Sequence, residues 1–136
     1  MSYASASLLQ AAVYQTLATD PAVSAMVGSA IYDQVPAGTL PSTYITLGPE
    51  TATQVSDRTG RSTRHDFSIS VNTDASGFLS IKDVAGVVTD ALQDATLVLP
   101  NGAVSVLEFQ RARARRIGNG ALRQIDLRFR ARVDLD

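Results

Sequence analysis

The most regular pattern in the sequence is a strict alternation of residue types in two stretches of the chain. In residues 63–73 one face carries Thr63, His65, Phe67, Ile69, Val71 and Thr73. In residues 122–135 one face carries Ile125, Leu127, Phe129, Ala131, Val133 and Leu135. Because successive side chains of a strand point to opposite faces, both stretches are predicted to be antiparallel strands with one buried face.

Helical spacing predicts two principal helices and a shorter one between them. Leu9, Val13 and Leu17 recur every fourth residue, which predicts a helix over roughly residues 5–19. A second apolar stripe predicts a helix over residues 77–93, and its members are Phe78, Ile81, Ala85, Val88 and Leu92. Asp20 followed by Pro21 is typical of a helix cap and a first helical residue, so residues 21–27 should form about two turns that end at Gly28.

The remaining apolar runs are short and are separated by residues that favour turns. Residues 31–33, 44–47 and 97–99 are predicted to be short strands, the second of them ended by Gly48 and Pro49. Residues 50–62 are polar and without periodicity. We therefore expect residues 50–62 to form a long loop, of the kind that is mobile or becomes ordered on a partner.

The segment 104–117 also resembles a strand, and Gly118, Asn119 and Gly120 are predicted to join it to residues 122–135 as a hairpin. A two-residue turn places Arg113 opposite Asp126, but it also places Phe109 opposite Arg130. A loop one residue longer pairs Phe109 with Phe129 and leaves Arg113 opposite Ile125. Since a slip by one residue exchanges the two faces of a strand, each register suits one half of the hairpin. A bulge between about residues 109 and 112 would reconcile the two halves.

The composition is that of a globular protein, and its length of 136 residues predicts a single domain over residues 1–136. The net charge is −1, so the overall charge favours neither DNA nor a membrane as a partner. The absence of cysteine excludes disulfides and thiolate metal sites. Neither a signal peptide nor an apolar run long enough for a bilayer is evident, so we expect a soluble protein made in a cytoplasm.

Charge is unevenly distributed along the chain. Residues 1–107 hold four basic and nine acidic residues, a net charge of −5, whereas residues 108–132 hold eight arginines and two acids, a net charge of +6. A dipolar chain of this kind suits self-association, because one face of a copy can meet the opposite face of another. Solvated charges would produce the same distribution.

The arginines fall on strands with an opposite apolar face, so they are predicted to form a stripe on the outer face of the hairpin. Three interpretations remain open: a face that is solvated or paired within the chain, a subunit interface that meets acids of a neighbour, and a surface that contacts nucleic-acid phosphate. The acidic balance of the whole chain argues against the third, as does the lack of interleaved aromatic residues.

No pattern in the sequence indicates catalysis, a cofactor or a metal. His65 is the only histidine, which leaves no metal-ligand set, and its place on an apolar face predicts a packed or edge residue. No serine lies in a nucleophile-elbow context. Glu50, Asp57 and Asp66 are not distinguished by spacing from ordinary loop and surface acids, and the glycines at 118 and 120 precede a strand rather than the helix of a phosphate-binding loop. We therefore do not expect an enzyme.

The order of the segments resembles a known family. Residues 8–50 read as a helix, a short helix ending in Val-Gly, then Ile-Tyr-Asp, a proline-containing loop and a strand ending in Leu-Gly. Residues 64–92 continue with a strand that has a histidine near its start and a glycine-led amphipathic helix, and residues 123–133 read RQIDLRFRARV. This order resembles the tail terminator (tail completion) proteins of long, non-contractile-tailed phages and of gene transfer agents.

The resemblance implies an α+β fold, mainly an antiparallel sheet with helices packed on it, and here with the long C-terminal hairpin and the two principal helices. It implies a virion protein, assembled in the host cytoplasm, that forms a hexameric ring at the head-proximal end of the tail tube. Such a ring halts tube polymerisation and binds the tail tube protein on one side and the neck or connector (stopper) protein on the other. DNA passes through it without sequence-specific contact, and no membrane or cofactor is implied.

Two sets of residues are candidates for these contacts. The candidate subunit interface consists of Arg111, Arg113, Arg115, Arg128, Arg130 and Arg132. The candidate loop for tube or neck contact contains Glu50, Gln54, Asp57, Arg58 and Arg61. Two other functions stay open: another tail or neck component, such as a tube subunit or connector protein, and a free nucleic-acid-binding module that uses the arginine hairpin.

Overall fold

A computed structural model describes residues 3–55, 62–93 and 95–136 and confirms an α+β fold. The helices are α1 (Ala4–Thr19), α2 (Pro21–Val27) and α3 (Leu79–Gln93). The strands are β1 (Ile31–Tyr32), β2 (Thr43–Gln54), β3 (Ser62–Thr73), β4 (Val98–Leu99), β5 (Gly102–Ile117) and β6 (Leu122–Leu135). Each predicted helix, and each of the short strands predicted at residues 31–33 and 97–99, lies within a few residues of its expected position.

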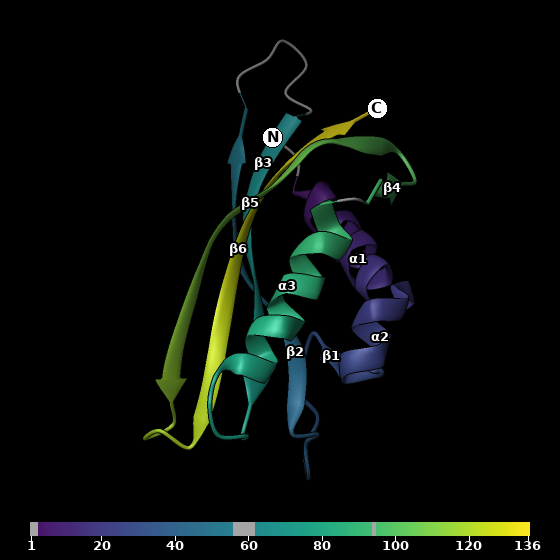
Figure 1. Ribbon diagram of the computed structural model, residues 1–136. Coiled ribbons are helices and arrows are strands. Elements are labelled where there is room, and N and C mark those ends of the chain that lie inside the picture. The colour runs from purple at the N-terminus through teal and green to yellow at the C-terminus, as the bar shows by residue number, and fades with distance from the viewer. Residues whose placement is uncertain (1–2, 56–61, 94) are drawn as a thin grey trace.

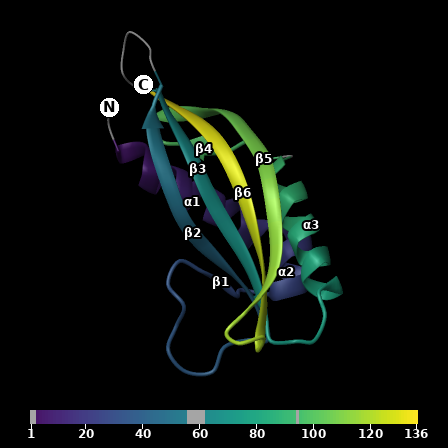
Figure 2. The same ribbon diagram turned by 90° about the vertical axis from the view of Figure 1, so that its left-hand side faces the viewer.

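The strands form one sheet in the order β1-β2-β3-β6-β5-β4. β1 runs parallel to β2, and every other neighbouring pair is antiparallel. The helices all cover the same face of the sheet (Figure 1), and the view onto the opposite face shows the long strands in front of the helices (Figure 2). One broad face of the sheet is therefore left open.

The core lies between the helices and the covered face of the sheet. The predicted stripe of α1 is buried, with Leu9, Val13 and Leu17 at most 2% exposed. The stripe of α3 is buried beside it through Ile81, Val84, Ala85, Val88 and Leu92. Both stripes pack against the apolar faces of β3 and β6. Burial of each large side chain contributes about 1.5–3 kcal/mol, so these two alternating strands and two helical stripes determine the layer arrangement.

The predicted cap between α1 and α2 is confirmed. The Asp20 carboxylate accepts hydrogen bonds from the backbone N–H groups of Ala22 at 2.9 Å and Val23 at 3.1 Å. Pro21 occupies the first helical position, where its missing N–H costs nothing. Gly28 ends the helix with a φ of +60°, a conformation that glycine adopts without strain.

The expected end of the second strand is wrong. β2 does not stop at Gly48 and Pro49 but continues to Gln54, and its register with β3 shifts between Leu47 and Glu50. The two residues therefore form a bulge within the strand rather than its end. Glycine suits this position, because a Cβ at position 48 would make a tight contact of 3.1 Å with the Ser68 carbonyl oxygen. Pairing with β3 thus overrides the local tendency to turn.

The predicted loop over residues 50–62 is correspondingly wrong at both ends. Residues 50–54 belong to β2 and pair with residues 63–67 of β3, and Ser62 begins β3. Residues 56–61, which include three of the candidate contact residues (Asp57, Arg58 and Arg61), lie outside the described residues.

The predicted bulge in the C-terminal hairpin is confirmed. Near the turn Arg113 pairs with Asp126, and farther along Phe109 pairs with Phe129, with a register shift between Phe109 and Arg111. Gln110 is the extra residue. The shift keeps Phe109 on the helix-covered face, where its ring centroid lies 5.7 Å from that of Phe129. A second shift, between Val104 and Val106, was not expected from the sequence.

The arginine-rich open face

The open face of the sheet carries the polar alternate residues of three adjacent strands. Paired residues of antiparallel strands share a face, and Arg111, Arg113 and Arg115 pair with Arg128, Asp126 and Gln124. All six predicted arginines therefore lie on the open face. We call this surface the arginine face and define it by Arg64, Asp66, Ser68 and Ser70 of β3, Arg111, Arg113 and Arg115 of β5, and Gln124, Asp126, Arg128, Arg130 and Arg132 of β6.

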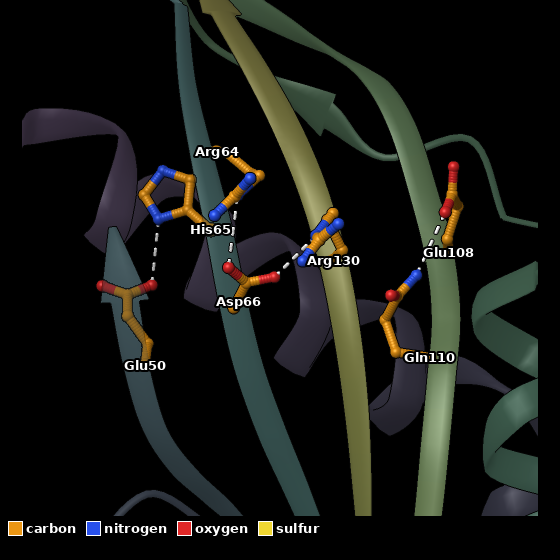
Figure 3. A network of polar contacts seen from close by, with 7 residues as sticks. All are labelled: Glu50, Arg64, His65, Asp66, Glu108, Gln110 and Arg130. Carbon is orange, nitrogen blue, oxygen red and sulfur yellow. Dashed lines mark hydrogen bonds and ion pairs between the residues drawn. The ribbon is translucent and has the colours of Figure 1, made fainter. Parts of the chain in front are cut away.

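In the half of the arginine face near the C-terminus, the guanidinium groups are paired within the chain. Asp66 lies between two of them, with Arg130 Nε 2.8 Å and Arg64 Nε 3.3 Å from its carboxylate oxygens (Figure 3). Arg132 Nε lies 3.1 Å from Asp134, which also accepts a hydrogen bond from Ser62 Oγ. These side chains are between 20% and 43% exposed. Because solvent screens the charges, each ion pair contributes about 0–1 kcal/mol to the free energy of unfolding.

The hydrogen bond from Ser62 has a consequence for the ionisation of Asp134. A hydroxyl that donates to a carboxylate favours the charged form. The Ser62 hydroxyl, assisted by Ser105 and Arg132, lowers the pKa of Asp134 below its ordinary value. Asp134 therefore stays ionised in the folded chain under conditions in which a free aspartate would begin to take up a proton.

In the half of the arginine face near the hairpin turn, most guanidinium groups have no such partner. Arg115 is the exception: it lies 3.4 Å from Asp126 and donates to Gln124 Oε1 at 3.1 Å. Ser70 Oγ donates to the same aspartate at 2.6 Å. Within residues 3–55, 62–93 and 95–136, Arg111, Arg113 and Arg128 form no ion pair. Their side chains are exposed.

The unpaired arginines line a hollow of about 400 Å³ on the open face. Its lining consists of Pro49, Ser68, Ser70, Arg111, Arg113, Arg115, Gln124, Asp126 and Arg128. Four arginines and one aspartate leave this hollow with a formal charge of +3. The hollow therefore offers guanidinium and hydroxyl donors to an anion, and no aromatic side chain lines it.

On the covered side of the sheet, a buried polar cluster ties α1 to the strands. His65 is fully buried, as expected for a packed residue. Its Nδ1 lies 3.1 Å from Glu50 Oε2 (Figure 3), and its Nε2 lies 2.9 Å from Ser5 Oγ. Tyr3 Oη donates to Glu50 Oε1 at 2.6 Å, and this hydrogen bond raises the pKa of Tyr3.

This cluster corrects the role expected for Glu50. The side chain lies in β2 beside His65 and is 17% exposed, rather than in a loop that is free to meet a partner. A serine, a histidine and a glutamate in hydrogen-bonded order have the arrangement of a hydrolase triad. However, Ser5 and His65 are both 0% exposed, so no substrate reaches the hydroxyl in this arrangement. The cluster stabilises the attachment of α1.

The structure brings some predicted residues together and separates others. It gathers the six arginines on one face, and it places Gln54 at the exposed end of β2. No pattern in the sequence singles out Ser5, Tyr3, Ser62 or Asp134, because their partners lie many residues away in the chain.

In the part of the chain described here, no cluster of three or more metal-ligating side chains occurs. No helix among these residues has the length and apolarity needed to cross a membrane.

Comparisons with known proteins agree over nearly the whole chain. Residues 11–134 match the family described as Tail completion protein gp17. A chain of the solved structure "Virion of native gene transfer agent (GTA) particle" is 53% identical and superposes with a TM-score of 0.92, covering 98% of this chain and 99% of that chain. A search among curated proteins found no match.

Proposed function

The chain belongs to the Tail completion protein gp17 family, as a structural protein of a phage or gene transfer agent tail, and we propose that it forms the ring that ends the tail tube. The ring is hexameric and lies at the head-proximal end of the tube. The observation that carries this proposal is the 53% identity and 0.92 TM-score with a chain of a gene transfer agent virion, since both chains are covered almost completely.

A ring of identical copies requires an interface between two different surfaces of the chain, repeated by a rotation that closes. The sheet offers such surfaces at its two edges. β4 pairs only with Gly102 and Ala103, so residues 104–117 of β5 leave one long edge without a partner among the described residues. At the opposite side, β1 covers β2 only at Ile45 and Thr46. The edge of β5 in one copy meets the edge of β2 in the next.

The ends of the long strands supply the two remaining surfaces. The β2–β3 end with Gln54 and the β5–β6 turn at residues 118–121 lie at opposite ends of the sheet (Figure 1). One end binds the last ring of the tail tube protein, and the other binds the neck or connector protein. The two ends differ chemically. Once one end is bound to the tube, the end that faces away from the tube does not match a further tube subunit, so growth of the tube stops.

The role of the six arginines in subunit contact stays a prediction. Arg115, Arg130 and Arg132 already have acidic partners in their own chain, so a neighbour's acids would compete with those partners. Arg111, Arg113 and Arg128 form no ion pair with a described residue, so an external anion would give each of them an ionic partner without displacing one. DNA that passes through the ring is one such anion.

Electron microscopy of particles that lack this protein tests the proposal. We expect tails of abnormal and variable length without heads attached, and restoration of uniform length by the wild-type chain supplied in trans. Absent tails would instead indicate a tube subunit, and tails of normal length without heads would indicate a connector protein. The mass and symmetry of the assembled species, measured on purified tails, separately test for six copies.

A further inference from the structure

We propose that the hollow on the arginine face binds the backbone phosphates of double-stranded DNA without reading its sequence. This inference deepens the proposed function, in which DNA passes through the ring, by naming the residues that meet it. The contact residues are Arg111, Arg113 and Arg128, and Arg115 and Ser68 line the same hollow.

The positive charge of the hollow is largely unsatisfied within the chain. The one carboxylate in the hollow, Asp126, is already held by Ser70 at 2.6 Å and Arg115 at 3.4 Å. Arg111 and Arg128 are direct partners in the β5–β6 register, so two like charges lie across from each other on the open face. Like charges in that position repel one another. An anion placed between them removes this repulsion.

The positive surface has the form of a row along β5. Arg111, Arg113 and Arg115 occupy alternate positions of one strand, so their Cα atoms recur about 6.7 Å apart, twice the rise of a strand. The hollow runs across β6 to Ser68 and Ser70 of β3. A row of donors on an open surface fits an extended polyanion better than an isolated ion. Guanidinium groups suit phosphate, since they form bidentate hydrogen bonds with its oxygens.

The alternative occupant of the hollow is an acidic surface of a neighbouring copy. The described acids without an ion pair are scattered over the strands, loops, termini and α3: Asp20, Asp33, Asp74, Asp83, Asp90, Glu108 and Asp136. Duplex DNA carries about one negative charge per 1.7 Å of its axis. A polyanion of this charge density meets several arginines at once. The lack of aromatic side chains, which in the sequence argues against nucleic acid, excludes base stacking in the hollow and leaves contact with the backbone phosphates.

The test is the binding of a fluorescent random-sequence DNA duplex to the purified chain, measured by anisotropy between about 50 and 200 mM salt. The hollow variant is Arg111→Gln, Arg113→Gln, Arg128→Gln. The control variant is Arg64→Gln, Arg130→Gln, Arg132→Gln, which removes the same charge from the same face outside the hollow. We expect the slope of log affinity against log salt to fall by about 2–3 for the hollow variant and by less than 1 for the control.

Three results would overturn the inference: no DNA binding by the wild-type chain at the lowest salt, unchanged binding by the hollow variant, or equal losses in both variants. Circular dichroism checks the fold, and the three single substitutions replace the hollow variant if it does not fold. Loss of self-association with retained DNA binding would assign the hollow to a subunit contact. The proposed function is tested separately, by the tails of particles that carry the hollow variant. Uniform tail length in those particles would leave the proposed function standing whatever the DNA-binding result.

Discussion

Ser5 Oγ lies 2.9 Å from His65 Nε2, which connects the first turn of α1 to the middle of the sheet. The other ring nitrogen of His65 lies 3.1 Å from Glu50 on β2. Three segments that are far apart in the sequence thus meet at one buried imidazole. The covered face of β3 would otherwise be expected to carry an apolar side chain at this position.

Replacement of this imidazole tests its structural role. His65→Ala should lower the free energy of unfolding by about 2–4 kcal/mol, because it leaves a cavity and removes the partner of Ser5. Urea unfolding followed by circular dichroism measures this change. His65→Gln, whose amide keeps one polar contact, should lose less. A His65→Ala protein within about 0.5 kcal/mol of the wild type would show that the cluster does not stabilise the fold.

The bulge at Gln110 is expected to be essential for the hairpin. Deletion of Gln110 forces one half of β5 to present its side chains to the wrong face. Either Phe109, which is 46% exposed and packs on Phe129, leaves the helix-covered face, or the arginines nearest the turn move onto that face, so we expect a loss of about 1–3 kcal/mol. Gln110→Ala keeps the residue count and should change stability by less than about 0.5 kcal/mol. Equal melting temperatures for the deletion and the substitution would contradict this interpretation.

The ion pair between Asp66 and Arg130 should make a small but measurable contribution. A double-mutant cycle with Asp66→Asn and Arg130→Gln should give a coupling of about 0.5–1 kcal/mol that weakens as salt is added. Arg128→Gln is the matched control, because Arg128 forms no ion pair with any described residue. Its effect should add to that of Asp66→Asn without coupling. Coupling of equal size in both cycles would indicate a general field effect instead.

Asp134 should make stability depend on pH in the acid range. Its pKa is lowered in the folded chain, chiefly by the hydrogen bond from Ser62. The carboxylate therefore stabilises the fold at pH values above its ordinary pKa of about 3.9, and this contribution is lost as pH falls through the lower pKa of the folded state. Wild-type protein should be more stable than Asp134→Asn at neutral pH, by less than about 1 kcal/mol because solvent screens the group.

The comparison of Asp134→Asn with the wild type across pH separates ionisation from packing. The difference between their unfolding free energies should shrink as the pH falls below about 4. Ser62→Ala removes the main cause of the lowered pKa, so it should reduce the pH dependence in the same range. A difference that stays constant down to acid pH would assign the effect of Asp134 to packing alone.

The sequence by itself determined the features that depend on local backbone geometry. The alternation in β3 and β6 identified their buried faces, since a strand repeats every two residues wherever it lies. The spacing of Leu9, Val13 and Leu17 identified the buried stripe of α1 in the same way. Even the bulge could be predicted, because the short turn left only two registers and each suited one half of the hairpin.

Only the tertiary structure decided which distant residues meet. Gly48 and Pro49 favour the end of a strand locally, but pairing with β3 on one side carries β2 through them as a bulge. Asp66 reaches Arg130 because β3 lies beside β6, and no short turn between those strands sets their register. The position of β3 beside β6 therefore decides which arginines are paired within the chain and which can bind an external anion. The physical reason is that strand order and long-range register come from packing the whole sheet against its helices, which no local pattern encodes.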